Sequence, residues 1–319
     1  MSQYRTVITD HGFPNLKLEE AALAAADSSL AVAQCKTPDE VVAVARDADA
    51  LLVQWAPVNA EVIAALRRCR IIVRYGIGYD NVDLAAAKAR GIPVCNVPDY
   101  GVNEVAEHAV SLGLSLARQL PQIDARLRAG TWKITPDRPM LALGESTFAT
   151  AGFGRIARHA HALMRGFGGK RLAYDPFVSA ISMAAEGVEK VELDALFARA
   201  DVLSLHLPLS TETKHFISAT RLASMKRTAI LVNTARGPLI DTLALAEALK
   251  AGTIAGAGLD VFESEPLAVD HPLRKAPNAL LTSHVAWYSE SSIPRLQRLA
   301  AEEVARGLRG EPLKNQVNK

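Results

Sequence analysis

The segment Gly152-Phe153-Gly154-Arg155-Ile156-Ala157 limits the possible folds of this chain more than any other feature. It follows an apolar run at Phe148–Ala151, opens a helical pattern at Arg155–Arg165, and is followed by Asp175 at the end of the next apolar run. In that context the glycines let the backbone approach a pyrophosphate, whose charge a helix N-terminus favours. The segment predicts a dinucleotide-binding α/β domain with cofactor contacts from Gly152, Gly154, Arg155, Ile156 and Asp175.

Asp175 also indicates which dinucleotide is bound. A carboxylate here accepts hydrogen bonds from ribose hydroxyls and repels a 2′-phosphate. The following residues, Pro176 to Ser182, include no cation that could bind such a phosphate. We therefore expect NAD rather than NADP. The strand before the glycines is weak, because Phe148–Ala151 contains two alanines and a threonine, which indicates a less rigid cofactor site and leaves its affinity open.

Apolar runs and helical patterns alternate along the chain, as in parallel sheets covered by helices. In the first hundred residues the predicted strands are Thr6–Thr9, Ala50–Gln54, Ile71–Arg74 and Pro93–Val97, and the predicted helices are Pro38–Arg46, Ala60–Arg68 and Asp83–Arg90. Later strands are predicted at Phe148–Ala151, Arg171–Tyr174, Val202–Leu205, Ala229–Val232, Ala257–Asp260 and Ala279–Thr282, and later helices at Arg155–Arg165, Leu193–Arg199, Ser218–Ser224 and Thr242–Ala251.

The length of 319 residues suggests about two domains. The last predicted helix, near Ser292–Leu308, has one apolar stripe, and we place it on the first unit because the second already has six strands. The predicted fold class is α/β, with two doubly wound parallel-sheet domains. A Rossmann dinucleotide-binding domain at residues 99–286 is inserted into a flavodoxin-like substrate domain at residues 1–98 and 287–319.

A long helical pattern at Asn103–Leu120 is apolar on most of its faces, so we expect it to be buried on most sides. It fits an inter-domain spine and a subunit interface equally well. We expect a homodimer through this helix, where His108 could contribute. His159 and His161, after the glycine loop, are expected to face solvent, and His206 to be structural.

Bulk properties exclude several classes of partner. The net charge of +2 provides no basic field for nucleic acid or a membrane surface, and no apolar run approaches the ~20 residues of a membrane helix. Cys35, Cys69 and Cys95 are widely spaced, which argues for reduced thiols and against a zinc site. The N-terminus lacks the apolar core of a signal peptide. We expect a cytoplasmic protein.

Arg236, Glu265 and His284 each follow a predicted strand in the last third of the chain. The carboxyl ends of parallel strands meet at one edge of the sheet, so these side chains should converge. Arg can bind the carboxylate of a 2-keto acid, His can give a proton to its carbonyl, and Glu can hold the His. Each residue alone could be a helix cap or a surface ion pair, but together they predict a catalytic set that needs no metal.

Several motifs occur in the order found in the NAD-dependent D-isomer-specific 2-hydroxyacid dehydrogenases, a family that the chain resembles over nearly its whole length. These motifs are Arg74–Asp83, Gly152–Ala157, Tyr174–Pro176, His206–Leu209, Asn233–Gly237, Asp260–Pro266 and His284. The resemblance implies hydride transfer between NADH and a C2 carbonyl, with Arg236, Glu265 and His284 as catalytic residues. It also implies cofactor contacts from Pro208, Thr234, Ala235, Arg236, Asp260 and His284, and substrate contacts from Arg74, Tyr75, Gly76, Ile77, Arg236 and Trp287.

The run Trp287-Tyr288-Ser289-Glu290, with Arg74 and Val102, resembles the C-terminal-binding-protein branch of that family. Some members of the branch are transcriptional corepressors, so the alternative function is an NADH-sensing binding protein with little turnover. The intact catalytic set favours the enzyme. Trp287 favours a substrate with an apolar or thioether side chain, whereas Arg74 could meet a second acidic group.

Overall fold

The computed structural model describes residues 2–136 and 138–319; Met1 and Asp137, in the predicted substrate and nucleotide domains, lie outside the described residues. The chain forms two compact units, Met1–Gly101 with Tyr288–Lys319, and Val102–Trp287. The predicted boundaries put residues 99–101 in the second unit and Trp287 in the first. They differ from the structure because the first helix of the second unit begins at Val102, and because the Trp287 indole donates to the carbonyl of His284 (2.9 Å).

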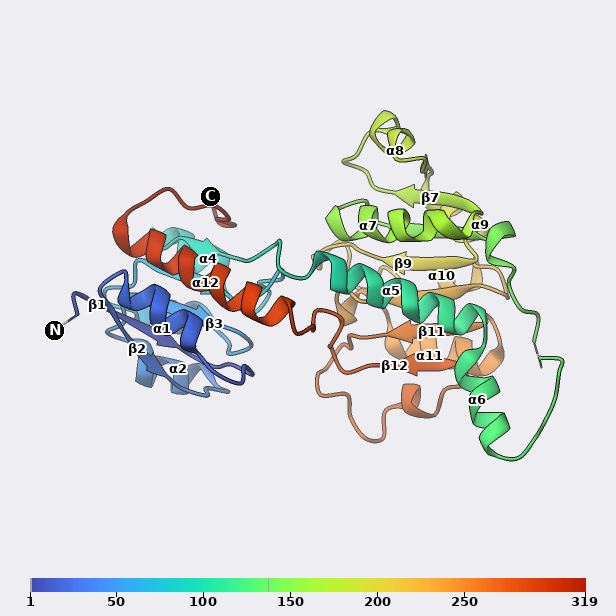
Figure 1. Ribbon diagram of the computed structural model, residues 1–319, viewed down its shortest axis with the longest axis horizontal. Helices are drawn as coiled ribbons and strands as arrows, with labels where there is room; N and C mark the ends of the chain where they lie inside the picture. The colour runs from blue at the N-terminus through green and yellow to red at the C-terminus, as the bar shows by residue number, and fades with distance from the viewer. Residues whose placement is uncertain (1, 137) are drawn as a thin grey trace. The chain divides into compact units, whose positions relative to one another are not determined.

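The first unit contains a five-stranded sheet (Figure 1). Its strands are β1 (Tyr4–Ile8), β2 (Ser28–Val32), β3 (Ala50–Val53), β4 (Ile71–Arg74) and β5 (Val94–Cys95). They lie in the order β2-β1-β3-β4-β5, and each neighbouring pair is parallel. This is the flavodoxin-like order, as predicted.

Helices from both ends of the chain complete the first unit. Three helices, α2 (Pro38–Ala45), α3 (Ala60–Ala65) and α4 (Leu84–Ala89), contribute buried side chains to one hydrophobic cluster with residues of the sheet. α12 (Ser292–Arg309) packs against α1 (Lys17–Ala24) and also against β3 and β4. The apolar stripe of α12 is therefore buried on the first unit, where the sequence places it.

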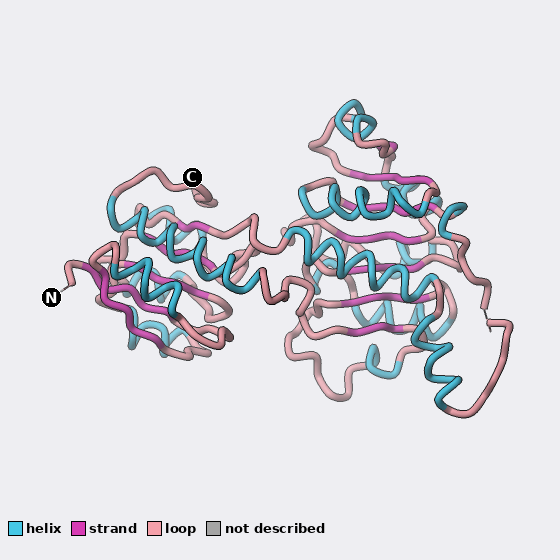
Figure 2. Tube along the Cα trace, in the orientation of Figure 1, coloured by secondary structure: helices cyan, strands magenta, loops and turns pink. Residues whose placement is uncertain are grey.

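The second unit contains a seven-stranded parallel sheet (Figure 2). Its strands are β6 (Thr147–Ala151), β7 (Lys170–Tyr174), β8 (Glu189–Lys190), β9 (Val202–Leu205), β10 (Ile230–Asn233), β11 (Gly256–Leu259) and β12 (Ala279–Leu281). They lie in the order β12-β11-β10-β9-β6-β7-β8. The strand order reverses between β6 and β9, and ligands of open α/β sheets bind at the carboxyl ends of the strands at such a point. The doubly wound Rossmann class is confirmed.

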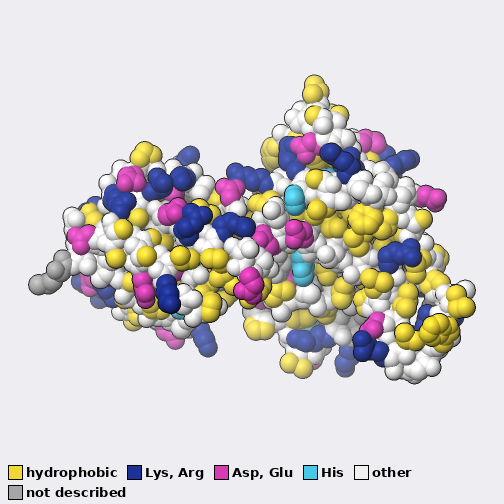
Figure 3. All heavy atoms as spheres, viewed as in Figure 1, with side chains coloured by type: hydrophobic (Ala, Val, Ile, Leu, Met, Phe, Trp, Pro, Cys, Tyr) yellow, Lys and Arg dark blue, Asp and Glu magenta, His cyan; other side chains and the backbone are white. Residues whose placement is uncertain are grey.

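The long helix predicted at Asn103–Leu120 ends three residues earlier in the structure, and a separate helix begins at Leu120. α5 (Val102–Ala117) ends before Gln119, whose φ is 52°, and α6 (Leu120–Arg128) begins with a proline in its first turn. Because proline lacks an N–H, it fits the start of a helix and not its interior. Hydrophobic side chains gather on the surface around α6 (Figure 3). Exposed apolar residues of α6 and of the segment after it are Leu120, Leu127, Trp132 and Ile134.

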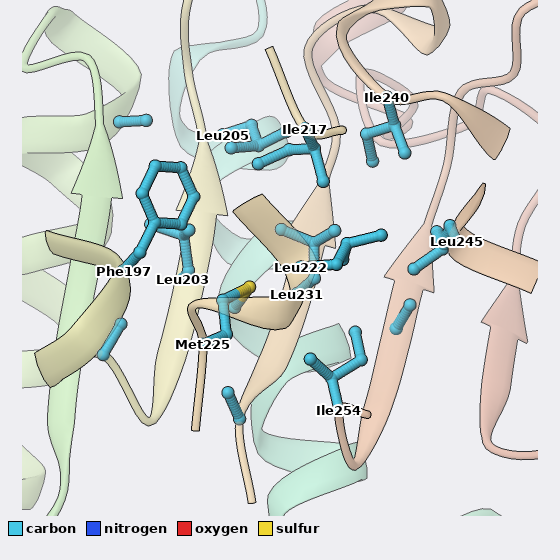
Figure 4. Close-up of a cluster of buried hydrophobic side chains, with 14 of the residues drawn as sticks. Phe197, Leu203, Leu205, Ile217, Leu222, Met225, Leu231, Ile240, Leu245 and Ile254 are labelled. Atoms are coloured by element: carbon cyan, nitrogen blue, oxygen red, sulfur yellow. The ribbon is translucent and has the colours of Figure 1, made fainter. Parts of the chain in front are cut away.

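Helices pack on both faces of the second sheet. α5 and α7 (Arg155–Met164) share one hydrophobic cluster with strand residues, and α5 is buried against α7, β10 and β11 of its own unit. α9 (Leu193–Arg199), α10 (Ala219–Ala223) and α11 (Thr242–Ala251) supply the other cluster (Figure 4). Fully burying one leucine stabilises a fold by about 1.5–3 kcal/mol, so these clusters fix the strand ends that carry the site.

β6 forms a regular central strand although its sequence is weak. All five residues are buried, and it pairs with β7 on one side and with β9 on the other. The Thr150 hydroxyl bonds to Nε2 of His161 on α7 (3.0 Å). His161 is 1% exposed, so the expectation that it faces solvent is wrong. Burial lowers the pKa of His161 to about 3, so the imidazole packs as a neutral core residue.

Several short elements have no counterpart in the prediction: α1, β2, α6, α8 (Ala180–Ala185) and β8. β2 lies at the edge of its sheet and only its first residue, Ser28, is buried, so it lacks a continuous apolar run. Single 3-10 turns occur at Leu143–Glu145, Arg165–Phe167, Gly237–Leu239 and Pro272–Lys275. No helix among the described residues has the length and apolar character needed to cross a membrane.

Candidate active site

The glycine loop lies between β6 and α7, at the switch point of the second sheet. Gly152 has φ +94°, and a Cβ there would lie 2.6 Å from the carbonyl oxygen of His206, so only glycine fits. Gly154 is the N-cap of α7 without a side-chain cap, and a Cβ there would meet open space. The first turn of α7 therefore presents uncapped N–H groups beside open space, which fits an anionic pyrophosphate.

Asp175 joins the end of β7 to the glycine loop. One carboxylate oxygen accepts from the N–H of Phe153 and the other from the N–H of Phe177, both at 2.8 Å. Each oxygen keeps a further lone pair, so the predicted contact with ribose hydroxyls is compatible with these bonds.

The turn after β10 holds the next group of predicted cofactor residues. The Asn233 side chain accepts from the N–H of Ala235 (3.0 Å) and donates to the carbonyl of Arg236 (2.8 Å), which fixes the turn. Thr234 is 8% exposed, and its buried hydroxyl has no hydrogen-bond partner among the described residues. A buried hydroxyl without a partner is costly unless a ligand satisfies it. Arg155, Ile156 and Pro208, the other predicted cofactor residues, remain predictions.

Arg236 is held against the loop that carries Glu265. Gly237 follows it directly, and a Cβ on Gly237 would overlap the carbonyl of Phe262. Glycine is thus required where the Arg236 turn meets the loop Asp260–Pro266. Arg236 also lies close enough to influence the Glu265 carboxylate electrostatically.

Glu265 and His284 are joined by a hydrogen bond. Oε2 of Glu265 lies 2.6 Å from Nδ1 of His284, and its Oε1 accepts from the N–H of Phe262 (2.9 Å). Burial alone would raise the pKa of Glu265, but the hydrogen bond and charge of His284, with the Phe262 N–H and Arg236, lower it below its ordinary value. Because Nδ1 is taken by Glu265, Nε2 is the ring nitrogen that can exchange a proton with a ligand.

Asp260 fixes the backbone that presents His284. Its side chain is fully buried and accepts from the Thr282 hydroxyl (2.6 Å) and from the N–H groups of Val285 (3.0 Å) and Ala286 (2.8 Å). His284 itself has φ 55°, an uncommon value for a non-glycine residue that these bonds support. The cofactor contact expected of Asp260 stays a prediction.

The remaining predicted substrate residues divide between the two units. In the first unit, Arg74 is the last residue of β4, and Tyr75, Gly76 and Ile77 follow it. Arg236 and Trp287 belong to the second unit. Tyr75 is 1% exposed and its hydroxyl donates to Glu19 (2.9 Å), so its side chain is fixed in the core and only its backbone can meet a ligand. Gly76 has φ +136°, and a Cβ there would overlap the guanidinium of Arg74.

Two histidines near the site have partners that the sequence did not reveal. His108 on α5 lies 3.0 Å from the hydroxyl of Thr282 and 3.7 Å from Asp260. It therefore helps to hold the Thr282 hydroxyl on the Asp260 carboxylate. His215 lies 2.6 Å from Glu263, inside the motif Asp260–Pro266. The motif indicated a functional loop at Asp260–Pro266. It could not show which side chain contacts Glu263, because His215 lies on a loop far away in the sequence.

Three kinds of similarity agree with this geometry. Residues 110–286 match the family described as D-isomer specific 2-hydroxyacid dehydrogenase, NAD binding domain. Among curated proteins, a D-3-phosphoglycerate dehydrogenase of Mycobacterium leprae is 39% identical over 305 residues, covering 95% of this chain and 57% of that protein. A glyoxylate reductase of Korarchaeum cryptofilum is 41% identical over 278 residues, covering 86% of this chain and 83% of that protein.

A solved structure is similar over almost the whole chain. The D-lactate dehydrogenase of Aquifex aeolicus, complexed with NAD and lactic acid, has a TM-score of 0.88 at 28% identity and covers 96% of each chain. The fold and the nucleotide-binding unit are therefore shared with proteins of this kind. The chain spans only 57% of the length of the Mycobacterium leprae relative.

Proposed function

Because the chain belongs to the D-isomer-specific 2-hydroxyacid dehydrogenase family, we propose that it interconverts a 2-keto acid and a D-2-hydroxy acid with NAD(H). The observation that carries the proposal is the 2.6 Å contact of Glu265 with His284, beside the Arg236 turn. A carboxylate, an imidazole and a guanidinium at the ends of neighbouring strands suit acid–base chemistry on a substrate that bears a carboxylate.

We propose one role for each of the three side chains. His284 gives a proton from Nε2 to the carbonyl oxygen during reduction and takes it back during oxidation. Glu265 keeps the ring oriented and stabilises its protonated form by an opposite charge. Arg236 binds the substrate carboxylate and polarises the carbonyl. When bound, the nicotinamide supplies or accepts the hydride at C2.

The second unit offers a site for NAD. The uncapped start of α7, the required Gly152 and the unpartnered hydroxyl of Thr234 fit its pyrophosphate and the adjoining groups. Asp175 would receive the adenosine ribose. The remaining cofactor contacts, from Arg155, Ile156, Pro208, Ala235 and Asp260, are part of the same proposal.

A panel of 2-keto acids tests the function. Purified protein is mixed with NADH and glyoxylate, pyruvate, longer aliphatic and thioether 2-keto acids, and a phosphorylated 2-keto acid, and loss of NADH absorbance is followed. Turnover of at least one compound that disappears in His284→Asn supports the proposal. Tight NADH binding without turnover of any compound would favour the corepressor-like alternative, which the dehydrogenase and reductase names of the relatives do not favour.

For the substrate we propose an apolar or thioether side chain rather than a phosphate. Trp287 is held next to the catalytic base, because its indole N–H donates to the carbonyl of His284 (2.9 Å). Its ring is a large and rigid apolar surface at a small entropic cost. Membership of the C-terminal-binding-protein branch, suggested by Trp287 and Arg74, belongs to this proposal. Preference for the phosphorylated compound in the panel would refute it.

We also propose a cytoplasmic homodimer. The three cysteines are free thiols, as expected of a reducing compartment. The apolar residues of α5 are largely buried within its own unit, so α5 alone offers little surface to a second copy. We therefore extend the proposed interface to the exposed apolar residues of α6 and of the segment after it, Leu120, Leu127, Trp132 and Ile134. A cluster of large apolar side chains on a surface is typical of an interaction site.

A further inference from the structure

Glu263 lies two residues before Glu265 in the loop Asp260–Pro266, and its carboxylate has a separate set of partners. One oxygen lies 2.6 Å from Nε2 of His215. The other accepts from the N–H (3.1 Å) and the hydroxyl of Thr242. Glu263 and Glu265 are therefore each paired with an imidazole, and only Glu265 has a role in the proposed chemistry.

Thr242 makes Glu263 part of a helix terminus. It is the first residue of α11 (Thr242–Ala251), a helix of ten residues, and it is 3% exposed. A carboxylate at this end satisfies an N–H that has no partner within the helix and interacts favourably with the helix dipole. Glu263 thus ties the loop to the rigid start of α11.

His215 connects Glu263 to a third segment. The N–H of His215 donates to the carbonyl of Pro238 (2.8 Å), which lies in the turn after Arg236. In the same place, a Cβ on Gly237 would overlap the backbone at Phe262 and Glu263. The turn of Arg236 and the loop of Glu265 are therefore joined through His215 and Glu263.

Two histidines lie near the Glu263 carboxylate and its partner Thr242. His215 contacts it directly, and Nε2 of His271 lies 3.4 Å from the hydroxyl of Thr242. Burial alone would raise the pKa of Glu263, but the bonds from Thr242 and His215 lower it below its ordinary value. The carboxylate is therefore ionised near neutral pH and keeps both contacts.

We propose that Glu263 is a positioning residue for the reaction: by binding Thr242 and His215 it holds the loop so that Glu265 stays on His284. The inference rests on the proposed function for its kinetic consequence, but the contacts stand independently of it. A shift of about 1 Å in a reacting group can cost about 10²-fold in rate, so a loose loop would matter even though Glu263 touches no reacting atom.

Glu263→Ala removes both contacts and is the main test. We expect kcat for keto-acid reduction to fall by about tenfold, with the KM for NADH unchanged. We also expect the alkaline limb of the pH profile of kcat/KM to move to lower pH, as in Glu265→Gln, because a displaced Glu265 stabilises the protonated His284 less. Thr242→Val should reproduce part of the effect. Thr242→Ser keeps the hydroxyl that binds Glu263 and should behave as wild type.

Asp241→Ala is the matched control. Asp241 is the N-cap of the same helix and accepts from the N–H of Ala244 (2.9 Å), but it does not bond to Glu263. Loss of an N-cap lowers Tm, so this variant measures what destabilising α11 does by itself. We expect its pH profile to match wild type. An equal shift in Asp241→Ala and Glu263→Ala, or a wild-type profile and kcat in Glu263→Ala, would overturn the proposal.

A second measurement separates this proposal from the proposed function. The ring titration of His284 is followed by NMR, with His284→Asn to identify its resonance. If no 2-keto acid is turned over, the function fails, and the titration still decides the role of Glu263. A lower midpoint in Glu263→Ala than in wild type supports positioning, and an unchanged midpoint refutes it. If Glu263→Ala does not fold, Glu263→Gln and Thr242→Val take its place in both measurements.

Discussion

His284 holds the proton on which the proposed reaction depends. Its Nδ1 is occupied by Glu265 at 2.6 Å and its backbone is fixed by Asp260 and Trp287, so only Nε2 is left for the substrate. His284→Asn should preserve NADH binding and lower kcat by about 10²–10⁴-fold, the usual contribution of general acid catalysis. Steady-state kinetics and NADH fluorescence titration measure the two quantities, and a near-normal kcat would refute the assignment.

Glu265→Gln removes the charge but keeps the shape of the carboxylate. Burial raises the pKa of Glu265, but the hydrogen bond to His284 and the other contacts outweigh burial and lower the pKa. The carboxylate is therefore ionised when the ring is protonated. Reduction needs the protonated ring, and without the charge that form is lost at lower pH. The pH optimum for reduction should therefore move downward, with a smaller loss of kcat than in His284→Asn. An unmoved or raised optimum contradicts this role.

The placement of single residues in the fold was more predictable than their hydrogen-bond partners. Arg236, Glu265 and His284 follow strands that a parallel sheet must align, so their convergence could be expected. The burial of His161 and the bonds of Glu263 could not, because they depend on where α7 and the loop with His215 lie in space. Periodicity shows which residues share a face of an element, but not which distant loop that face meets.

At the scale of elements, we propose that Asp175 at the end of β7 selects the dinucleotide. Asp175 receives the N–H groups of Phe153 and Phe177, and the Phe177 side chain is 95% exposed, so an arginine there would be free to reach a 2′-phosphate. Wild type should prefer NADH in kcat/KM, and Asp175→Ser with Phe177→Arg should move the preference toward NADPH. Phe177→Ala is the control and should leave it unchanged. A wild-type preference for NADPH would contradict the role of Asp175.

Element prediction succeeded where burial is continuous, and it missed the edge strands β2 and β8. Strands such as β3 and β9 are buried at every position and appear in the sequence as apolar runs. β2 and β8 are short edge strands with few buried residues, and α6 contributes no buried residue. Their sequences therefore show no clear periodic pattern of apolar residues. The weak sequence of β6 still forms a strand, because neighbours on both sides pair with it.

At the scale of the molecule, the exposed apolar surface around α6 should form the homodimer interface. Leu127→Glu with Ile134→Glu places charges where two copies would meet, and burying unpaired charges is costly. We expect this variant to be monomeric at micromolar concentration by light scattering and wild type to be dimeric. Val269→Glu, at an exposed apolar residue far from α6 in sequence, should stay dimeric. A monomeric wild type refutes the interface.

The central claim is that this chain reduces a 2-keto acid to the D-2-hydroxy acid, and the stereochemistry of the product tests it most directly. The best substrate of the panel is reduced with NADH to completion, and the hydroxy acid is separated by chiral chromatography. A member of this family with His284 as proton donor should give the D enantiomer alone, and His284→Asn should give almost none in the same time. An L or racemic product, or no product from any 2-keto acid, would contradict the claim.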